Sequence, residues 1–357
     1  MWRILFGAVL GLVFVSQSKA ADVVLKSTTY REETHIGDYW IAEDLSRGFQ
    51  KMGISTIIDY RDEYHRQHDP HPKMSIYMRG YTKFIPPYDA GITVLYCYYP
   101  MAYFRHSGQK KSKNVLNSRS SMPYLASLDD DWQNFDIIAV ASSSYTKKLN
   151  DAGISAYYVP QFTNPAKFYP QYDPKVANDI LFVGSNWHYR TSLHYAIDSG
   201  FDVAVYGYNW QNVVPSDMYK GQYIENQDLH RYYSSAKIVL NDHRPDMKEF
   251  GFINNRIYDA TASGALVISD YMPEIKQAYG DSIPMYRNQK ELAHLLRYYL
   301  SHDAERQEKA RRARQITLQN FTNVAVAQKI NGIARKMSIN SIKIDKYPKE
   351  LDTKLKE

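Results

Sequence analysis

Two series of alternating strand-like and helix-like segments run along this chain, and a proline-rich stretch separates them. Pro160, Pro165, Pro170 and Pro174 punctuate that stretch. Prolines at this spacing are typical of a linker between domains. Strands that alternate with helices predict parallel sheets covered by helices, so we expect an α/β protein of two domains. The length of 357 residues agrees with two domains rather than one.

The hydrophobic pattern places the elements of each series. In the first, we expect strands at 22–30, 54–58, 74–78, 91–96, 135–141 and 156–159, and helices at 40–52 and 147–152. In the second, we expect strands at 179–184, 202–206, 236–240 and 265–269, and helices at 190–199, 228–235, 255–262, 289–300 and 304–336. Gly332 is the expected weak point of the last helix. The predicted organisation is an N-terminal domain at 21–160, a linker at 161–178, a C-terminal domain at 179–338 and a charged tail at 339–357.

Residues 1–20 have the pattern of a secretory signal peptide. A positively charged start precedes an apolar stretch at 4–15, and the small residues Ser18 and Ala20 precede Ala21. The apolar stretch is short for a membrane span. We therefore expect an exported protein, periplasmic or secreted. The alternative is an uncleaved anchor that associates with the membrane through residues 4–15.

Charge and cysteine content narrow the function classes. The net charge is +6, but the basic residues are spread out and form no concentrated basic and aromatic patch, so we expect no nucleic-acid partner. Cys97 is the only cysteine of the sequence, which excludes an intramolecular disulfide and a cysteine zinc cluster. We expect it to be a buried thiol. His65, His68 and His71 are irregularly spaced among prolines and indicate a polar loop rather than a metal site.

Residues 250–264 carry the clearest chemical pattern. A glycine-containing loop leads into the expected helix at 255–262, whose free N–H groups and dipole favour an anion such as a diphosphate. Asn254 or Asn255 can cap this helix, and Arg256 adds a cation. Asp259 shares one helix face with Asn255 and Arg256, where a carboxylate can accept hydrogen bonds from ribose. The pattern equally allows an ordinary capped helix with an Arg–Asp surface pair.

The segment from Asn255 to Gly264, Asn-Arg-Ile-Tyr-Asp-Ala-Thr-Ala-Ser-Gly, followed by Ile268-Ser269-Asp270, resembles the donor-site motif of the spore-maturation-protein type of family-1 glycosyltransferases. The similarity continues at 135–142, 159–161, 168–170, 182–185 with Arg190, 291–300 and 320–322. This resemblance implies the GT-B fold, in which two Rossmann-like domains face each other across a cleft, with C-terminal helices.

The resemblance also implies site residues and an activity. Asp259 would hold the ribose, and Asn254, Asn255 and Arg256 would hold the diphosphate. Gly184, Ser185 and Arg190 would line the opposite lip, and Gly264 closes the motif. The chain would be a glycosyltransferase, hexosyltransferase-like, that moves a sugar from a nucleotide-sugar co-substrate to a glycan, lipid or protein acceptor. It would use no metal cofactor, because the helix dipole and arginine stabilise the departing diphosphate.

Some positions depart from the family pattern. Asp259 stands where glutamate is common, and Asn320 where histidine is frequent. The first glutamate of the paired-glutamate pattern has no match, since Glu249 is too far from Asp259. In the first domain, His35 and Asp38 are the best candidates for a catalytic base. Hydrogen bonding within the loop, with Asp38 capping the next helix, is an equal alternative.

An export signal conflicts with a nucleotide-sugar enzyme, because these donors are made in the cytoplasm or imported into organelles. Three interpretations follow. Residues 1–20 are an uncleaved anchor that faces a compartment with donor, or the donor is of another kind such as a lipid-linked sugar, or the fold is retained for binding only. The last gives the alternative function, an exported two-lobed carbohydrate- or solute-binding protein without catalysis.

Overall fold

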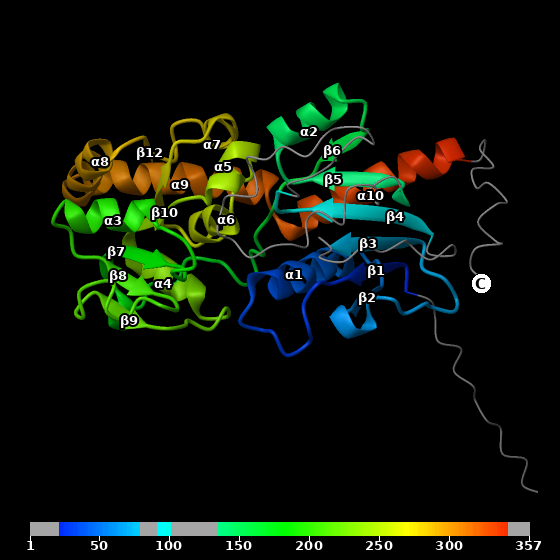
Figure 1. Ribbon diagram of the computed structural model, residues 1–357, viewed down its shortest axis with the longest axis horizontal. Helices are drawn as coiled ribbons and strands as arrows, with labels where there is room; N and C mark the ends of the chain where they lie inside the picture. Colours follow the sequence, from blue (N-terminus) through cyan, green and yellow to red (C-terminus); the bar gives the residue numbers. More distant parts are fainter. Residues whose placement is uncertain (1–20, 79–90, 101–133, 342–357) are drawn as a thin grey trace, which may run out of the picture.

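The computed structural model describes residues 21–78, 91–100 and 134–341, and shows two α/β domains side by side (Figure 1). Each domain is built on a six-stranded sheet, with strand orders β2-β1-β3-β4-β5-β6 and β12-β11-β10-β7-β8-β9. Neighbouring strands pair in parallel in both sheets. The expected α/β fold of two Rossmann-like domains is thus confirmed. The predictions for residues 1–20 and for the end of the tail lie outside the described residues.

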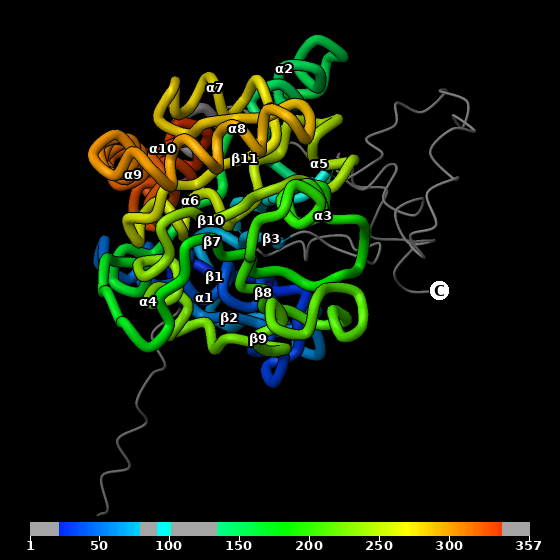
Figure 2. The backbone as a smooth tube through the Cα atoms, turned by 90° about the vertical axis from the view of Figure 1, so that its left-hand side faces the viewer, coloured from blue at the N-terminus to red at the C-terminus, as the bar shows by residue number. Residues whose placement is uncertain are grey.

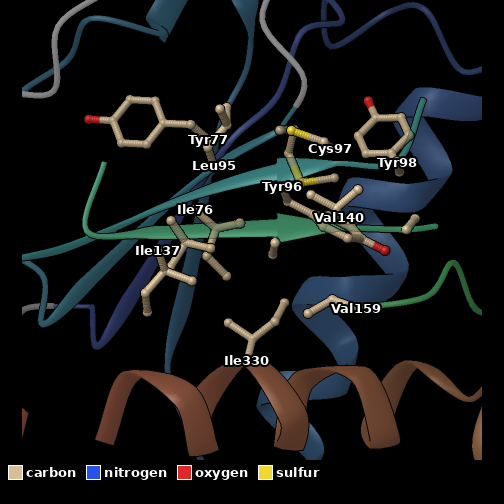
Figure 3. Close-up of a cluster of buried hydrophobic side chains, with 14 of the residues drawn as sticks. Ile76, Tyr77, Leu95, Tyr96, Cys97, Tyr98, Ile137, Val140, Val159 and Ile330 are labelled. Atoms are coloured by element: carbon tan, nitrogen blue, oxygen red, sulfur yellow. The ribbon is translucent and has the colours of Figure 1, made fainter. Parts of the chain in front are cut away.

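The N-terminal sheet is buried on both faces, which explains its nearly continuous apolar strands. Its strands are β1 Val23–Lys26, β2 Thr56–Asp59, β3 Met74–Met78, β4 Ile92–Cys97, β5 Ile137–Val140 and β6 Ala156–Tyr158. Its helices are α1 Gly37–Lys51 and α2 Ser143–Asp151, with a 3₁₀ turn at Arg61–Glu63. Figure 3 shows the core around β4 and β5, with Ile330 packing from a helix below. Cys97 is buried, as expected.

The C-terminal sheet separates two apolar cores, one on each face. Its strands are β7 Asn178–Val183, β8 Ala204–Tyr206, β9 Tyr219–Gly221, β10 Ala236–Asn241, β11 Leu266–Asp270 and β12 Met285–Tyr286. Its helices are α3 Thr191–Asp198, α4 Leu229–Ser235, α5 Pro245–Phe250, α6 Asn255–Ala262, α7 Pro273–Tyr279, α8 Gln289–Ser301 and α9 Asp303–Asn320. In the described part of the chain, no helix combines the length and the apolar character that a membrane crossing needs.

The helix expected at 304–336 is two helices, because the chain breaks after α9 and resumes as α10, Asn323–Ser341. The expected weak point, Gly332, lies inside α10 and interrupts nothing. Thr322 caps the second helix, since its Oγ1 accepts from the N–H of Ala325 at 3.1 Å. Phe321 packs in the C-terminal core, whereas Ile330 packs in the N-terminal core. The boundary expected at 338 therefore moves, because α10 returns to the N-terminal domain (Figure 1).

The chain crosses between the domains twice, and the two crossing segments lie side by side. The N–H of Thr163 donates to the carbonyl of Phe321 at 2.9 Å, and the N–H of Asn323 donates to the carbonyl of Thr163 at 2.8 Å. The start of the linker, residues 161–164, is buried. The linker is thus a packed element and not a free tether.

Candidate functional site

The carboxyl ends of β7 and β10 meet beside the start of α6, and in open α/β sheets ligands bind beyond such strand ends. Arg256 of α6 donates from Nη1 to Oδ1 of Asn241, at the end of β10, at 2.9 Å. A Cβ atom placed on Gly184, just after β7, would lie 2.7 Å from Nη2 of Arg256 and 3.5 Å from Nη2 of Arg190. The bare glycine therefore lets two guanidinium groups approach the strand end together.

Positive charge exceeds negative charge at this point. Arg190 donates from Nε to the carbonyl of Ser185 at 3.1 Å, and its Nη1 lies 3.5 Å from Oδ1 of Asp242. The other oxygen of Asp242 accepts from the N–H and Oγ of Ser192, at 3.1 and 3.0 Å. Among the described residues, no carboxylate lies within ion-pair distance of Arg256. We call Arg190 and Arg256, with the strand ends they contact, the cation cluster.

The protonation of neighbouring groups reflects this excess of positive charge. Burial, and then the charge of Arg256, lowers the pKa of Arg190 to about 10, so the guanidinium stays protonated at neutral pH. Burial, and then the charge of Arg190, lowers the pKa of His188 to about 4. The imidazole of His188 is therefore neutral near pH 7, and its Nε2 is buried without a hydrogen-bond partner among the described residues. Groups perturbed in this way are typical of binding sites.

The start of α6 lacks the side-chain cap that the sequence predicts. Asn254 occupies the N-cap position, but it makes no capping hydrogen bond and its Nδ2 donates to the carbonyl of Asp242 at 2.8 Å. Asn255 donates from Nδ2 to Oδ2 of Asp259 at 2.7 Å. The Oδ1 atoms of both asparagines are buried without partners in the described structure. The first N–H groups of the helix, beside Arg256, thus receive no cap from the Asn254 side chain, and a helix start of this kind favours an anion.

Asp259 is buried, with 6% of its surface exposed, and it does not form the alternative Arg–Asp surface pair. Its Oδ1 accepts from Oγ1 of Thr163 at 2.7 Å, and its Oδ2 accepts from Asn255. Burial raises the pKa of Asp259 to about 7. The carboxyl thus ties α6 to the linker instead of standing open at the domain boundary. Its role toward ribose stays a prediction.

Gly264 lies at the other end of α6. It follows the C-cap Ser263, has a φ of +88°, and donates its N–H to the carbonyl of Thr261 at 3.0 Å. Because the helix of eight residues is about 12 Å long, the structure does not bring Gly264 to the cation cluster. The glycine ends the helix, where the left-handed conformation favours a residue without Cβ.

The two candidate catalytic residues lie in and after the loop that follows β1. His35 is exposed, whereas Asp38 is buried in the first turn of α1, whose N-cap residue is Ile36. The carbonyl of Thr34 in the same loop accepts from the hydroxyl of Tyr223 at 3.4 Å. The loop therefore touches the C-terminal domain beyond β9. The catalytic role of His35 and Asp38 stays a prediction.

Sequence reasoning missed His243, just after β10, and gave no role of its own to Asp270, which ends β11. His243 is buried, its Nδ1 lies 2.7 Å from Oδ1 of Asp270, and its Nε2 has no partner among the described residues. Although burial raises the pKa of Asp270, the hydrogen bond and charge of His243, together with Lys248, hold it below its ordinary value. The available signal was the run from Asn241 to His243, directly after an apolar strand.

The histidines of the polar loop after β2 belong to the other domain. Nε2 of His68 lies 2.8 Å from Oδ2 of the buried Asp59, which also pairs with Lys26 at 2.6 Å. Within the described residues, no cluster of histidine, cysteine or carboxylate side chains has an arrangement that could hold a metal ion. His68 thus lies in hydrogen-bond contact with a buried Lys26–Asp59 ion pair.

Comparisons with known proteins agree with this architecture. Residues 190–332 match the family model described as "Glycosyl transferase-like". The chain is 27% identical over 199 residues to the spore protein CgeB of Bacillus subtilis (strain 168), an alignment that covers 50% of this chain and 61% of that protein. The chain thus spans less than two thirds of the length of this curated relative.

Among solved structures, sucrose-phosphate synthase from Thermosynechococcus elongatus superposes with a TM-score of 0.62 at 12% identity, over 89% of this chain and 99% of that one. Anabaena HepE, solved with UDP and glucose, superposes with a TM-score of 0.56 at 10% identity, over 88% and 99%. At such identities the likeness establishes the fold. The resemblance found in the sequence is confirmed: residues 190–332 match the glycosyl transferase-like model, and the chain has the two-domain GT-B fold.

Proposed function

We propose that this protein is a glycosyltransferase that takes its sugar from a nucleotide-sugar donor. The observation that carries the proposal is the cation cluster: Arg190 and Arg256 converge beside the uncapped start of α6, with Asp242 as the one carboxylate near them among the described residues. A diphosphate supplies the negative charge that this arrangement lacks. HepE, which has the same fold, was solved with UDP and glucose.

The same groups suit the transfer step. When the bond between the sugar carbon and the diphosphate breaks, the diphosphate leaves with the electron pair and its negative charge grows. Arg190, Arg256 and the N–H groups of α6 are already oriented toward that charge, so they stabilise the transition state more than the ground state. The acceptor oxygen then bonds to the sugar carbon and gives its proton to a base, for which His35 and Asp38 are the candidates. In this proposal the guanidinium groups supply the positive charge, and the reaction needs no metal ion.

The acceptor and the location of the protein belong to the same proposal. We place the acceptor, which is a glycan, a lipid or a protein, against the N-terminal domain. The pattern of residues 1–20 supports export to the periplasm or the exterior, or attachment to the membrane through residues 4–15. For both possible locations, export and membrane attachment, the only support is the sequence pattern of residues 1–20.

A calorimetric titration of the purified full chain with UDP, GDP, ADP and TDP tests the donor site. We expect saturable binding of one nucleotide, weakened at least tenfold in Arg256→Gln, because one charge-assisted contact to phosphate is worth about 1.5–3 kcal/mol. Arg311→Gln is the matched control, since Arg311 is an exposed arginine on α9 that pairs with Glu308.

The outcomes separate the two candidate functions. If none of the four nucleotides binds, or if Arg256→Gln binds as tightly as the unaltered chain, the nucleotide-sugar proposal fails. A lipid-linked donor or an exported saccharide-binding protein then becomes the better explanation. If a nucleotide binds at the cation cluster, hydrolysis or transfer of the matching nucleotide sugar distinguishes an enzyme from a binding protein.

A further inference from the structure

A cavity of about 590 Å³ lies between the domains along one side of α1, a volume typical of ligand pockets. Figure 2, which looks from the C-terminal domain toward the N-terminal domain, shows α4 and α1 in the same lower part of the molecule. Its lining residues come from α1, from the linker and from the start of α4: Trp40, Arg47, Gln50, Lys51, Asn164, Ala166, Lys167, Tyr169, Gln227 and His230. The lining contains none of the residues of the cation cluster. The cavity is therefore a separate feature of the domain boundary.

The cavity is electropositive. Arg47, Lys51 and Lys167 contribute three cations, and none of the described lining residues is an aspartate or glutamate. Lys167 pairs with Asp44, just outside the lining, whereas the half-exposed Arg47 lies 3.6 Å from the nearest carboxylate oxygens. Two carboxylates, Glu43 and Asp44, therefore face the three cations, and one positive charge is left in excess. The lining thus favours an anionic occupant.

Flat rings and amides complete the lining. Tyr169 stacks on His230 with ring centroids 4.5 Å apart, and Lys167 Nζ lies 4.3 Å from the ring centroid of Trp40. Nδ1 of His230 lies 2.9 Å from the carbonyl oxygen of Gln227, and its Nε2 lies 2.9 Å from the side-chain amide of Gln171. Burial lowers the pKa of His230, so the ring adds no charge at neutral pH. Aromatic faces with amide groups beside them suit the apolar faces and hydroxyl groups of a sugar ring.

We propose that this cavity is a second binding site, for an anionic saccharide, a sugar that carries a phosphate or a carboxylate. The anionic character follows from the lining alone, whereas the choice of a saccharide rests on the proposed function. The site is distinct from the cation cluster that takes the nucleotide diphosphate.

The linker connects this cavity to α6. Thr163 donates to Asp259 of α6, and Asn164, next along the chain, donates from Nδ2 to Oδ1 of Asp44 at 2.7 Å. Lys167 pairs with the same Asp44. An anion that draws Lys167 away from Asp44 thus acts on the segment that holds Asp259. We therefore expect the two sites to change each other's affinity by the same factor.

Calorimetric titrations of the full chain with glucose 6-phosphate, with glucuronate and with glucose test the proposal. We expect saturable binding of an anionic sugar and none of glucose, and the better anion identifies the group recognised. The double variant Arg47→Gln/Lys51→Gln should bind at least tenfold more weakly. Its control, Lys147→Gln/Arg311→Gln, removes two exposed cations elsewhere and should bind as the unaltered chain does.

Arg256→Gln separates this proposal from the proposed function. If the cavity is the site, Arg256→Gln weakens nucleotide binding and leaves the anionic sugar unaffected, while the cavity double variant does the reverse. The proposal is overturned if neither anionic sugar binds, if the cavity double variant binds as tightly as its control, or if only Arg256→Gln abolishes the binding. Nucleotide binding is measured on the same preparations, and its outcome decides the proposed function without affecting the test of the cavity.

Discussion

Asp259 is the residue whose surroundings depart most from what its position in the sequence suggests. Its folded-state pKa of about 7 lies above the ordinary value of about 3.9, so the folded state binds more protons than the unfolded state between these values. Its effect on stability is therefore most favourable below about pH 4 and is lost as the pH rises through 7. Asp259→Asn keeps the shape and removes the titration.

We expect the unfolding free energy of Asp259→Asn, relative to the unaltered chain, to rise with pH between 5 and 7, by at most about 1.4 kcal/mol per unit. Urea unfolding at pH 5, 6 and 7 measures this difference. The opposite titration of His188 is present in both proteins and cancels. A difference that does not change with pH would mean that Asp259 is already ionised in the fold.

The close approach of Arg256 to Gly184 leads to a second prediction about a single residue. An alanine there places its Cβ 2.7 Å from Nη2 of Arg256, the far end of a flexible side chain, and so displaces the guanidinium rather than the backbone. We expect Gly184→Ala to unfold at nearly the same urea concentration as the unaltered chain and to bind the nucleotide about tenfold more weakly, a loss of roughly one charge-assisted contact. Gly221→Ala is the control, since its Cβ would meet only Tyr206 at ordinary contact distance. Equal nucleotide affinity in Gly184→Ala would place the diphosphate away from the strand end.

The positions of Gly184 and Arg256 can be predicted from the sequence, whereas the contacts of Asp259 cannot, and the reason is physical. Gly184 follows an apolar strand and Arg256 opens a helix, so local pattern and topology suffice to bring them to one edge of the sheet. The partner of Asp259 is Thr163, 96 positions away in the linker, and no local pattern carries that contact. The missing cap at Asn254 has the same origin, because its amide is used by the backbone of Asp242.

At the scale of elements, the division between α9 and α10 depends on tertiary contacts. The sequence from 304 to 336 reads as one helix, and most strands and helices lie where the hydrophobic period places them. The break falls at Phe321–Thr322 because this segment pairs with Thr163 and passes between the domains. The short helices α5 and α7, each beginning at a proline, have too few residues for a period to show.

Thr322→Ala tests the cap at this break. Loss of the hydroxyl leaves the N–H of Ala325 without its acceptor, and we expect the unfolding free energy to fall by about 1 kcal/mol. Thr322→Ser keeps the oxygen and should stay within a few tenths of a kcal/mol of the unaltered chain. Urea unfolding of the three proteins measures both values. Equal losses in the alanine and serine variants would assign the effect to the methyl group and not to the cap.

At the scale of the whole molecule, the domains also touch at a seam beside α2, formed by Ser142 and Ser144 on one side and by Phe250, Gly251 and Glu274 on the other. Oγ of Ser142 donates to the carbonyl of Phe250 at 2.6 Å, and Oγ of Ser144 donates to Oε1 of Glu274 at 2.6 Å. Helices α2 and α7 lie near each other in both views (Figures 1 and 2). Together with the paired crossings, the seam joins the two domains.

Gly251→Ala tests whether this seam holds the domains in place. Gly251 has a φ of +70°, and its added Cβ would overlap Oγ of Ser144 and Oε1 of Glu274, so both side chains must move and the seam loses their hydrogen bond. Gly200→Ala is the matched control, because Gly200 also ends a helix, its φ is +81° and nothing lies within 4 Å of its Cβ. Both variants share the backbone strain of about 1–2 kcal/mol.

We expect Gly251→Ala alone to show a larger radius of gyration in small-angle scattering and a weaker nucleotide affinity, because the two domains no longer close together. If both variants have the same radius of gyration and the same nucleotide affinity, the paired crossings at Thr163 and Asn323 determine the orientation of the domains. The seam then has no influence on that orientation.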